Sequence, residues 1–123
     1  EYTPSGYVVS RYIDDKAAVA ALIEVMAYFK RNNLKPKYRT LLAFPIYEEI
    51  GHGGAYVPEE VEEYVALDIG LIGPDYHAAI RAGNNVYAAA FGMAVINSHG
   101  KERCHIDSIV DTTKLAIAYA LDL

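Results

Sequence analysis

Five acidic residues and one histidine stand where apolar runs meet loops, so that their side chains could gather into one polar site. They are Asp14 and Asp15 in SRYIDDKAAVAAL, Glu48 and Glu49 in LLAFPIYEEIGHGGA, Asp68 in EYVALDIG, and His105 in GKERCHIDSI. A carboxylate at the end of a buried strand is costly unless a cation or hydrogen bonds compensate its charge. Carboxylates and imidazoles are also common ligands of divalent metal ions. The pattern therefore indicates a metallohydrolase site.

Simpler structural interpretations exist for most of these residues. Asp15 alone would serve as a helix cap, Asp68 could accept backbone hydrogen bonds at a strand end, and His105 could be an ordinary, partly buried histidine. The doublet Glu48–Glu49 could lie in a solvated acidic turn. Adjacent side chains on an extended segment point in different directions, however, so one glutamate could bind a metal ion while the other acts as a general base.

Other residues carry weaker signals. His52 is expected to line the turn after the glutamate doublet, and nothing in the local pattern requires His77 or His99 to approach a substrate. Cys104 and His105 are neighbours on an expected extended segment, so their side chains should diverge and a Cys-His nucleophile is not indicated.

Composition limits the classes of protein to which this chain can belong. Its 123 residues suffice for one hydrophobic core but not for two ordinary domains, and a hydrophobic content of 53% argues against general disorder. A formal charge of −5 without a basic stripe argues against nucleic-acid binding. No apolar stretch approaches the roughly 20 residues of a membrane-spanning helix. The single Cys104 and the lack of a visible signal peptide favour a cytoplasmic location.

Strand-like and helix-like patterns alternate along the chain. They predict strands at residues 6–13, 39–47, 64–69 and 85–91, and helices at residues 16–31, 58–63, 75–82 and 111–121. Asp75 and Asp111 are the expected caps of the last two helices, and Gly83 is an expected left-handed stop. The alternation predicts an α/β fold with helices on both faces of a sheet. Sites in such folds form beyond the strand ends, where the acidic residues fall.

The sequence resembles the glutamyl-aminopeptidase-like metallopeptidases, which include the tetrahedral (TET) aminopeptidases and some members labelled endoglucanase. The matching segments occur in the family order over most of the chain: RYIDDKAAVAALIEVMAYFKRNN, YEEIGHGGA, EYVALDIG, DYHAAIRAG and HGKERCHIDSIVDTTKLAIAYAL. The resemblance implies a three-layer αβα fold with a central mixed sheet, the core of a zinc-exopeptidase-like enzyme. It also implies a peptide substrate and a homo-oligomer for the full-length protein.

The resemblance further implies a role for each residue of the predicted site. Glu48 would be the general base that takes a proton from the attacking water. Two divalent ions, zinc or cobalt, would share Asp14, with Glu49 and His105 completing one site and Asp68 serving the other. Asp15, joined to Asp14 by an uncommon cis peptide, would act from outside the coordination shell.

Several parts of the family pattern are missing from this sequence. A metal-binding His in a Gly-His-x-Asp segment and an inserted β domain are expected upstream, and a long helix and a strand are expected near residues 73–74. The second metal site therefore has only Asp14 and Asp68, and residues 1–123 are expected to be a partial catalytic domain. The expected function is a metal-dependent aminopeptidase that removes N-terminal residues from peptides. The alternative is a non-catalytic or truncated remnant that acts only as a folded or associating module.

Overall fold

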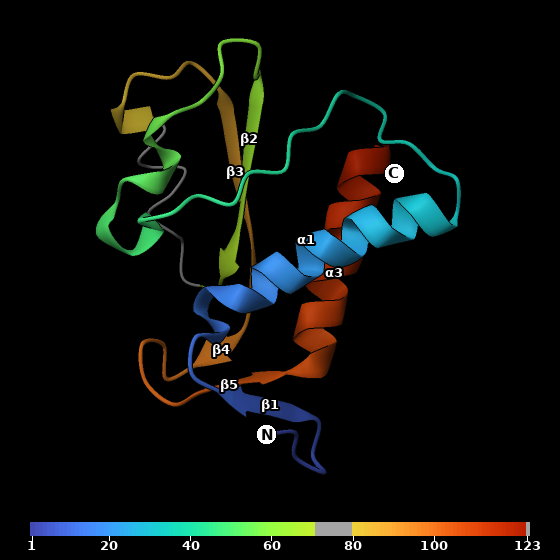
Figure 1. Ribbon diagram of the computed structural model, residues 1–123, viewed down its shortest axis with the longest axis vertical. Coiled ribbons are helices and arrows are strands. Elements are labelled where there is room, and N and C mark those ends of the chain that lie inside the picture. The colour runs from blue at the N-terminus through green and yellow to red at the C-terminus, as the bar shows by residue number, and fades with distance from the viewer. Residues whose placement is uncertain (71–79, 123) are drawn as a thin grey trace.

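The structure is a computed structural model that describes residues 1–70 and 80–122 (Figure 1). Its elements are, in chain order, β1 (Tyr7–Ser10), α1 (Ile13–Arg31), the short 3-10 helices η1 (Glu48–Ile50) and η2 (Gly53–Ala55), β2 (Glu63–Ile69), β3 (Tyr87–Met93), β4 (Val95–Ile96), β5 (Glu102–His105) and α3 (Ile106–Leu121). No helix within these described ranges is long and apolar enough to cross a membrane.

The strands belong to two small sheets. β2 and β3 pair in parallel, with Asp68 opposite Gly92 near the ends of the two strands. β5 lies between β1 and β4 and is antiparallel to both. Together with the helices, these sheets form a small mixed α/β fold, in agreement with the α/β class expected from the sequence.

Both long helices lie on one side of the parallel pair (Figure 1). α1 packs against β2, α3 packs against β3, and the two helices also contact each other. A core cluster of Ile13, Ala17, Ala18, Met93 and Cys104 joins the first turns of α1 to the end of β3 and to β5. This packing fixes the start of α1 close to both sheets, because small alanine side chains allow a close approach of the helix.

Several predicted elements are confirmed, with shifted ends. The helix predicted at residues 16–31 is α1, and the strand predicted at residues 64–69 is β2. The strands predicted at residues 6–13 and 85–91 overlap β1 and β3. Gly83 has the expected left-handed conformation, with φ +86. Most of the helix predicted from Asp75, its cap, His77 and the expected gap near residues 73–74 lie outside the described residues.

The predicted start of the last helix at Asp111 is wrong, because α3 already begins at Ile106. Its N-cap is His105, whose side chain accepts a hydrogen bond from the Asp107 N–H. The hydroxyls of Thr112 and Thr113, which directly follow the predicted cap Asp111, donate to backbone carbonyls four residues earlier in the helix. Threonine supports either arrangement locally, so the sequence did not distinguish a cap from a helix interior.

The strand predicted at residues 39–47 and the helix predicted at residues 58–63 are also wrong. Residues 39–47 contain no strand, and large side chains such as Phe44 and Ile46 are exposed. A strand needs a hydrogen-bonded neighbour, and β2 pairs with β3 in the described structure. The acidic segment before β2 makes a single turn, in which the Val61 N–H donates to the Pro58 carbonyl.

Candidate metal centre

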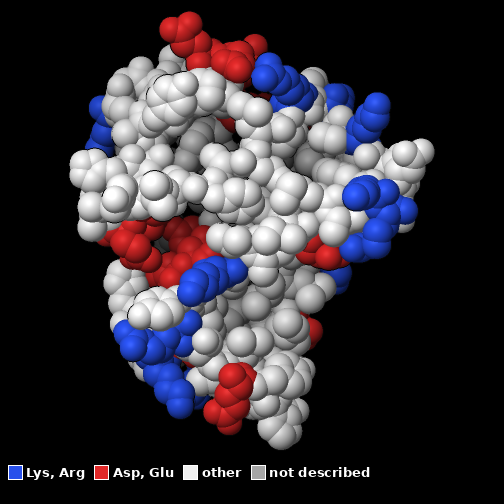
Figure 2. Space-filling model, in the orientation of Figure 1, with Lys and Arg blue, Asp and Glu red and all other residues white. Residues whose placement is uncertain are grey.

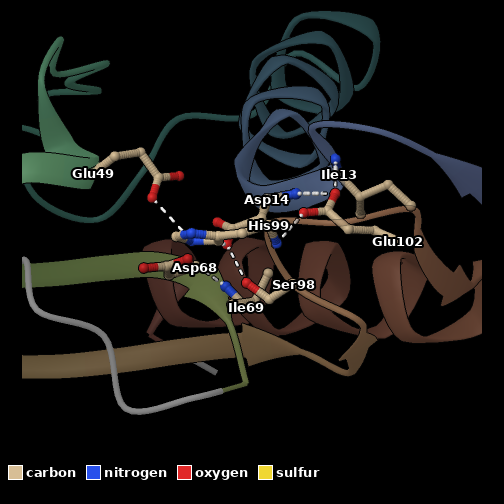
Figure 3. Close-up of polar contacts among 8 residues, drawn as sticks. All are labelled: Ile13, Asp14, Glu49, Asp68, Ile69, Ser98, His99 and Glu102. Atoms are coloured by element: carbon tan, nitrogen blue, oxygen red, sulfur yellow. Dashed lines mark hydrogen bonds and ion pairs between the residues drawn. The ribbon is translucent and has the colours of Figure 1, made fainter.

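Asp14, Glu49 and His99 form a group in which one potential ligand atom of each residue lies within 4.8 Å of the others. The Nε2 atom of His99 is 3.3 Å from Asp14 Oδ2 and 3.1 Å from Glu49 Oε2 (Figure 3). The Asp14 side chain is 7% exposed, whereas those of Glu49 and His99 are 51% and 67% exposed. The group is therefore buried at Asp14 and open to solvent at Glu49 and His99. Its one nitrogen and two oxygen donors suit a divalent ion such as zinc.

The backbone at the start of α1 gives the side chains of Asp14 and Asp15 different hydrogen-bond partners. Tyr12 is left-handed and the Asp14–Asp15 peptide is cis, as the family resemblance implied. Asp15 Oδ1 accepts a hydrogen bond from the Ala18 N–H, so Asp15 caps the regular part of the helix. The Asp14 carboxylate instead accepts a hydrogen bond from Ser98 Oγ at 2.8 Å.

Ser98 and His99 belong to the turn between β4 and β5. Asn97 and His99 both have positive φ angles, and the Gly100 N–H closes the turn on the Asn97 carbonyl. Asparagine tolerates the left-handed conformation better than most residues, which favours a turn at this point of the sequence. The turn directs two polar side chains at Asp14.

The 3-10 helix η1 supplies both glutamates of the doublet. Tyr47 before it and Gly51 after it are left-handed, so the doublet lies in a tight turn rather than on an extended segment. Consecutive residues of a 3-10 helix point about 120° apart, so the two glutamate side chains still diverge. Glu49 contacts His99, and the negative charge of Glu48 acts on Asp15 instead.

Four of the predicted acidic residues share one electrostatic environment. Burial, followed by the charge of Asp68, raises the pKa of Asp15 to about 8, and the charges of Asp14 and Glu48 act in the same direction. Asp68 is buried at the end of β2, where its Oδ1 lies 2.6 Å from the Ile69 N–H. Figure 2 shows acidic side chains gathered in a hollow near the start of α1. A cation in this hollow would relieve the repulsion between the carboxylates.

His105 lies outside this group in the structure. Its ring meets Tyr7 edge-on, with the ring centroids 5.0 Å apart, and its Nδ1 accepts from the Asp107 N–H. Its Nε2 lies against Gly6, where an added Cβ would come within 2.5 Å. These contacts give His105 a structural role between β1 and α3, one of the readings that the sequence left open.

His99 was not among the site residues predicted from the sequence. The available signal was the turn-forming stretch NSHG, since residues in tight loops at strand ends often carry function. Neither β4 nor β5 was predicted, however, so the turn between them was not recognised. Only the antiparallel pairing of β5 with β1 and β4 places this turn beside Asp14.

Two comparisons relate the chain to known proteins. The sequence model of the M42 glutamyl aminopeptidase family matches residues 1–78, which include all the candidate acidic residues but not His99. The putative aminopeptidase YhfE of Bacillus subtilis (strain 168) is 28% identical over an alignment of 169 positions, which covers 97% of this chain and 49% of the relative. The chain thus spans about half the length of that curated relative.

Proposed function

Because the chain belongs to the M42 glutamyl aminopeptidase family, we propose that it carries part of the catalytic centre of a metal-dependent aminopeptidase acting on the N-terminal residues of peptides. The observation that carries this proposal is the convergence of Asp14, Glu49 and His99. The three residues come from α1, η1 and the β4–β5 turn, and their donor atoms fit one divalent cation.

Asp14, Glu49 and His99 would hold the first cation, zinc or cobalt, so His99 takes the ligand role that the sequence resemblance gave to His105. Asp68 together with Asp14 would hold the second. The position of Asp68 supports this role, because it lies at the end of β2 and acts electrostatically on the residue next to Asp14. A bound divalent ion would polarise the scissile carbonyl and favour ionisation of water.

The residues of the chain itself would contribute positioning and proton transfer. Glu48 is half-buried and stands next to a proposed ligand, so it is placed to accept a proton from the attacking water. The hydrogen bond from Ser98 would hold the Asp14 carboxylate in one orientation. The acidic hollow would attract the positively charged amino terminus of a peptide.

We also propose that residues 1–123 are a partial catalytic domain of a longer enzyme. The stretch aligned with the Bacillus subtilis relative has 169 positions, more than the chain has residues, which supports a missing internal segment. The exposed apolar side chains of residues 39–47 are surfaces that such a segment would cover. The complete protein would then have the three-layer αβα fold and form a cytoplasmic homo-oligomer.

The rival function is a non-catalytic remnant that folds without turning over peptides. It is favoured by the small set of ligands for a second cation, Asp14 and Asp68. Metal content by elemental analysis and hydrolysis of an aminoacyl chromogenic substrate distinguish the two functions. For the enzyme, Glu48→Gln should keep its metal and lose about 10²- to 10⁴-fold of the activity, the usual contribution of a general base.

Glu59→Gln, at an exposed glutamate in the turn before β2, is the matched control and should keep both metal and activity. Bound metal without turnover in the unmodified protein would favour the remnant. A folded protein that binds neither zinc nor cobalt would contradict both the metal centre and the enzyme.

A further inference from the structure

Glu102 is the one charged residue among the most completely buried side chains of the described structure, at 1% exposure. A buried carboxylate is stable only when hydrogen bonds or opposite charges compensate it. Three backbone N–H groups do so here (Figure 3). Oε2 accepts from the Ile13 N–H and, at 3.1 Å, from the Asp14 N–H, while Oε1 accepts from the His99 N–H at 3.0 Å.

One oxygen of this carboxylate binds the start of α1. The Ile13 and Asp14 N–H groups lie before the regular part of α1, because Asp14 and Asp15 have non-helical φ and ψ angles, and Tyr12 supplies no side-chain hydrogen bond to them. Glu102 reaches these two groups from β5 and compensates both of them with hydrogen bonds to one carboxylate oxygen. A residue distant in the sequence thus fixes the backbone of Asp14, just before the helical turn that Asp15 caps.

The other oxygen binds the turn that carries His99. The same carboxylate therefore links the backbones of Asp14 and His99, whose side chains lie 3.3 Å apart. Ser98 adds a second link between the turn and the Asp14 side chain. The distance between the two proposed ligands depends on both backbones staying in place.

We propose that Glu102 is a positioning residue that holds Asp14 and His99 at the spacing required to bind a cation. This role rests on the proposed function, because it concerns the same site. Glu102 itself is directed at backbone N–H groups and acts on the cation only through the two ligands.

The test compares Glu102→Gln with the unmodified protein. Glutamine has nearly the same shape, but its amide nitrogen cannot accept a hydrogen bond. The hydrogen bond to the backbone N–H of either Asp14 or His99 is therefore lost. Binding of Co²⁺ alone, measured by calorimetry, should weaken by about 10- to 100-fold, as is typical when a residue that orients metal ligands is changed. In the metal-free protein, amide hydrogen exchange at Asp14 or His99 should become faster.

Cys104→Ala is the matched control, because Cys104 is equally buried and lies on the same strand. It should lower stability but leave the Co²⁺ affinity of the folded protein and the exchange of the two amides unchanged. If Glu102→Gln does not fold, Glu102→Asp is the second variant, because it keeps the charge but has a shorter side chain. It should also weaken Co²⁺ binding and speed amide exchange at Asp14 or His99.

Unchanged Co²⁺ affinity in a folded Glu102 variant, or unchanged exchange at both amides, would overturn the positioning role. Failure of the proposed function has a different signature, since the unmodified protein would then bind no Co²⁺. Amide exchange in the metal-free protein would in that case still decide whether Glu102 holds the two backbones.

Discussion

His99 Nε2 lies 3.3 Å from Asp14 Oδ2, which brings the turn before β5 into contact with the first residues of α1. The contact is reinforced by Ser98 and by the buried carboxylate of Glu102. The proposed cation site therefore depends on the packing of β5 against α1, and changes at either element should alter it.

The two histidines near the end of the chain should respond differently to substitution. His99→Ala removes a proposed ligand, so the affinity for Co²⁺ should fall strongly. Loss of a residue that only orients a ligand already costs about 10- to 100-fold in affinity, and the loss of a ligand should cost at least as much. Calorimetric titration of the metal-free protein measures this. A variant that binds Co²⁺ as tightly as the unmodified protein would exclude His99 from the site.

His105→Ala should instead reduce stability and leave Co²⁺ binding intact. It removes the cap of α3 and the contact with the Tyr7 ring, and loss of a cap costs about 1 kcal/mol. Urea unfolding gives the stability, and the titration used for His99 gives the affinity. Loss of Co²⁺ binding here, with retention in His99→Ala, would restore the role that the sequence resemblance assigned to His105.

A bound cation should stabilise the fold, because it binds the folded chain and not the dispersed ligands of the unfolded chain. At a free concentration 100 times the dissociation constant, the gain in unfolding free energy is about 2.7 kcal/mol. Thermal unfolding with added zinc or with a chelator measures the difference. This metal-dependent difference in stability should shrink strongly in Asp14→Asn. It should remain in the control Asp111→Asn, because Asp111 is an exposed residue on α3 that pairs with Lys114. Equal shifts in both variants would place the cation elsewhere.

Gly92→Ala should weaken the parallel pair beside Asp68. A Cβ at this position would lie 2.8 Å from Gly70 Cα and 2.9 Å from the Ile69 carbonyl oxygen, both backbone atoms that can move only with the strand. Overpacking of this kind costs about 1–3 kcal/mol. Urea unfolding should show this loss, whereas Ala88→Ser, at an exposed position on the same strand, should change stability little.

The contact between Tyr119 and Glu63 should make stability fall at high pH. The hydrogen bond to Glu63, with a smaller effect of burial, raises the pKa of Tyr119 from 10.0 to about 12. The folded state therefore keeps a proton that the unfolded state loses across this interval, so the contribution is complete below pH 10 and is lost toward pH 12. The effect is modest because Tyr119 is partly exposed.

Unfolding free energies measured across that pH range should decline less steeply in Tyr119→Phe than in the unmodified protein. Tyr56→Phe, at a tyrosine that is 82% exposed, is the control and should follow the unmodified protein. Parallel curves for all three proteins would show that the contact does not affect stability.

The sequence by itself determined the features that depend on neighbouring residues. The helical periodicity of residues 16–31 predicted α1, and the apolar run before Asp68 predicted β2. The acidic residues at the ends of these runs could also be singled out as candidates, because polar side chains at the boundaries of buried segments can be recognised locally. Their individual roles in metal binding remain predictions.

The tertiary structure alone decided which residues complete the site. His99 and His105 are both histidines near β5, but only the pairing of β5 with its neighbouring strands turns His99 toward Asp14 and His105 toward Tyr7. Glu102 gave no signal in the sequence, because its three partners lie in the backbone of two separate segments. Residues 39–47 show the same limit, since β propensity forms a strand only where a pairing partner is within reach.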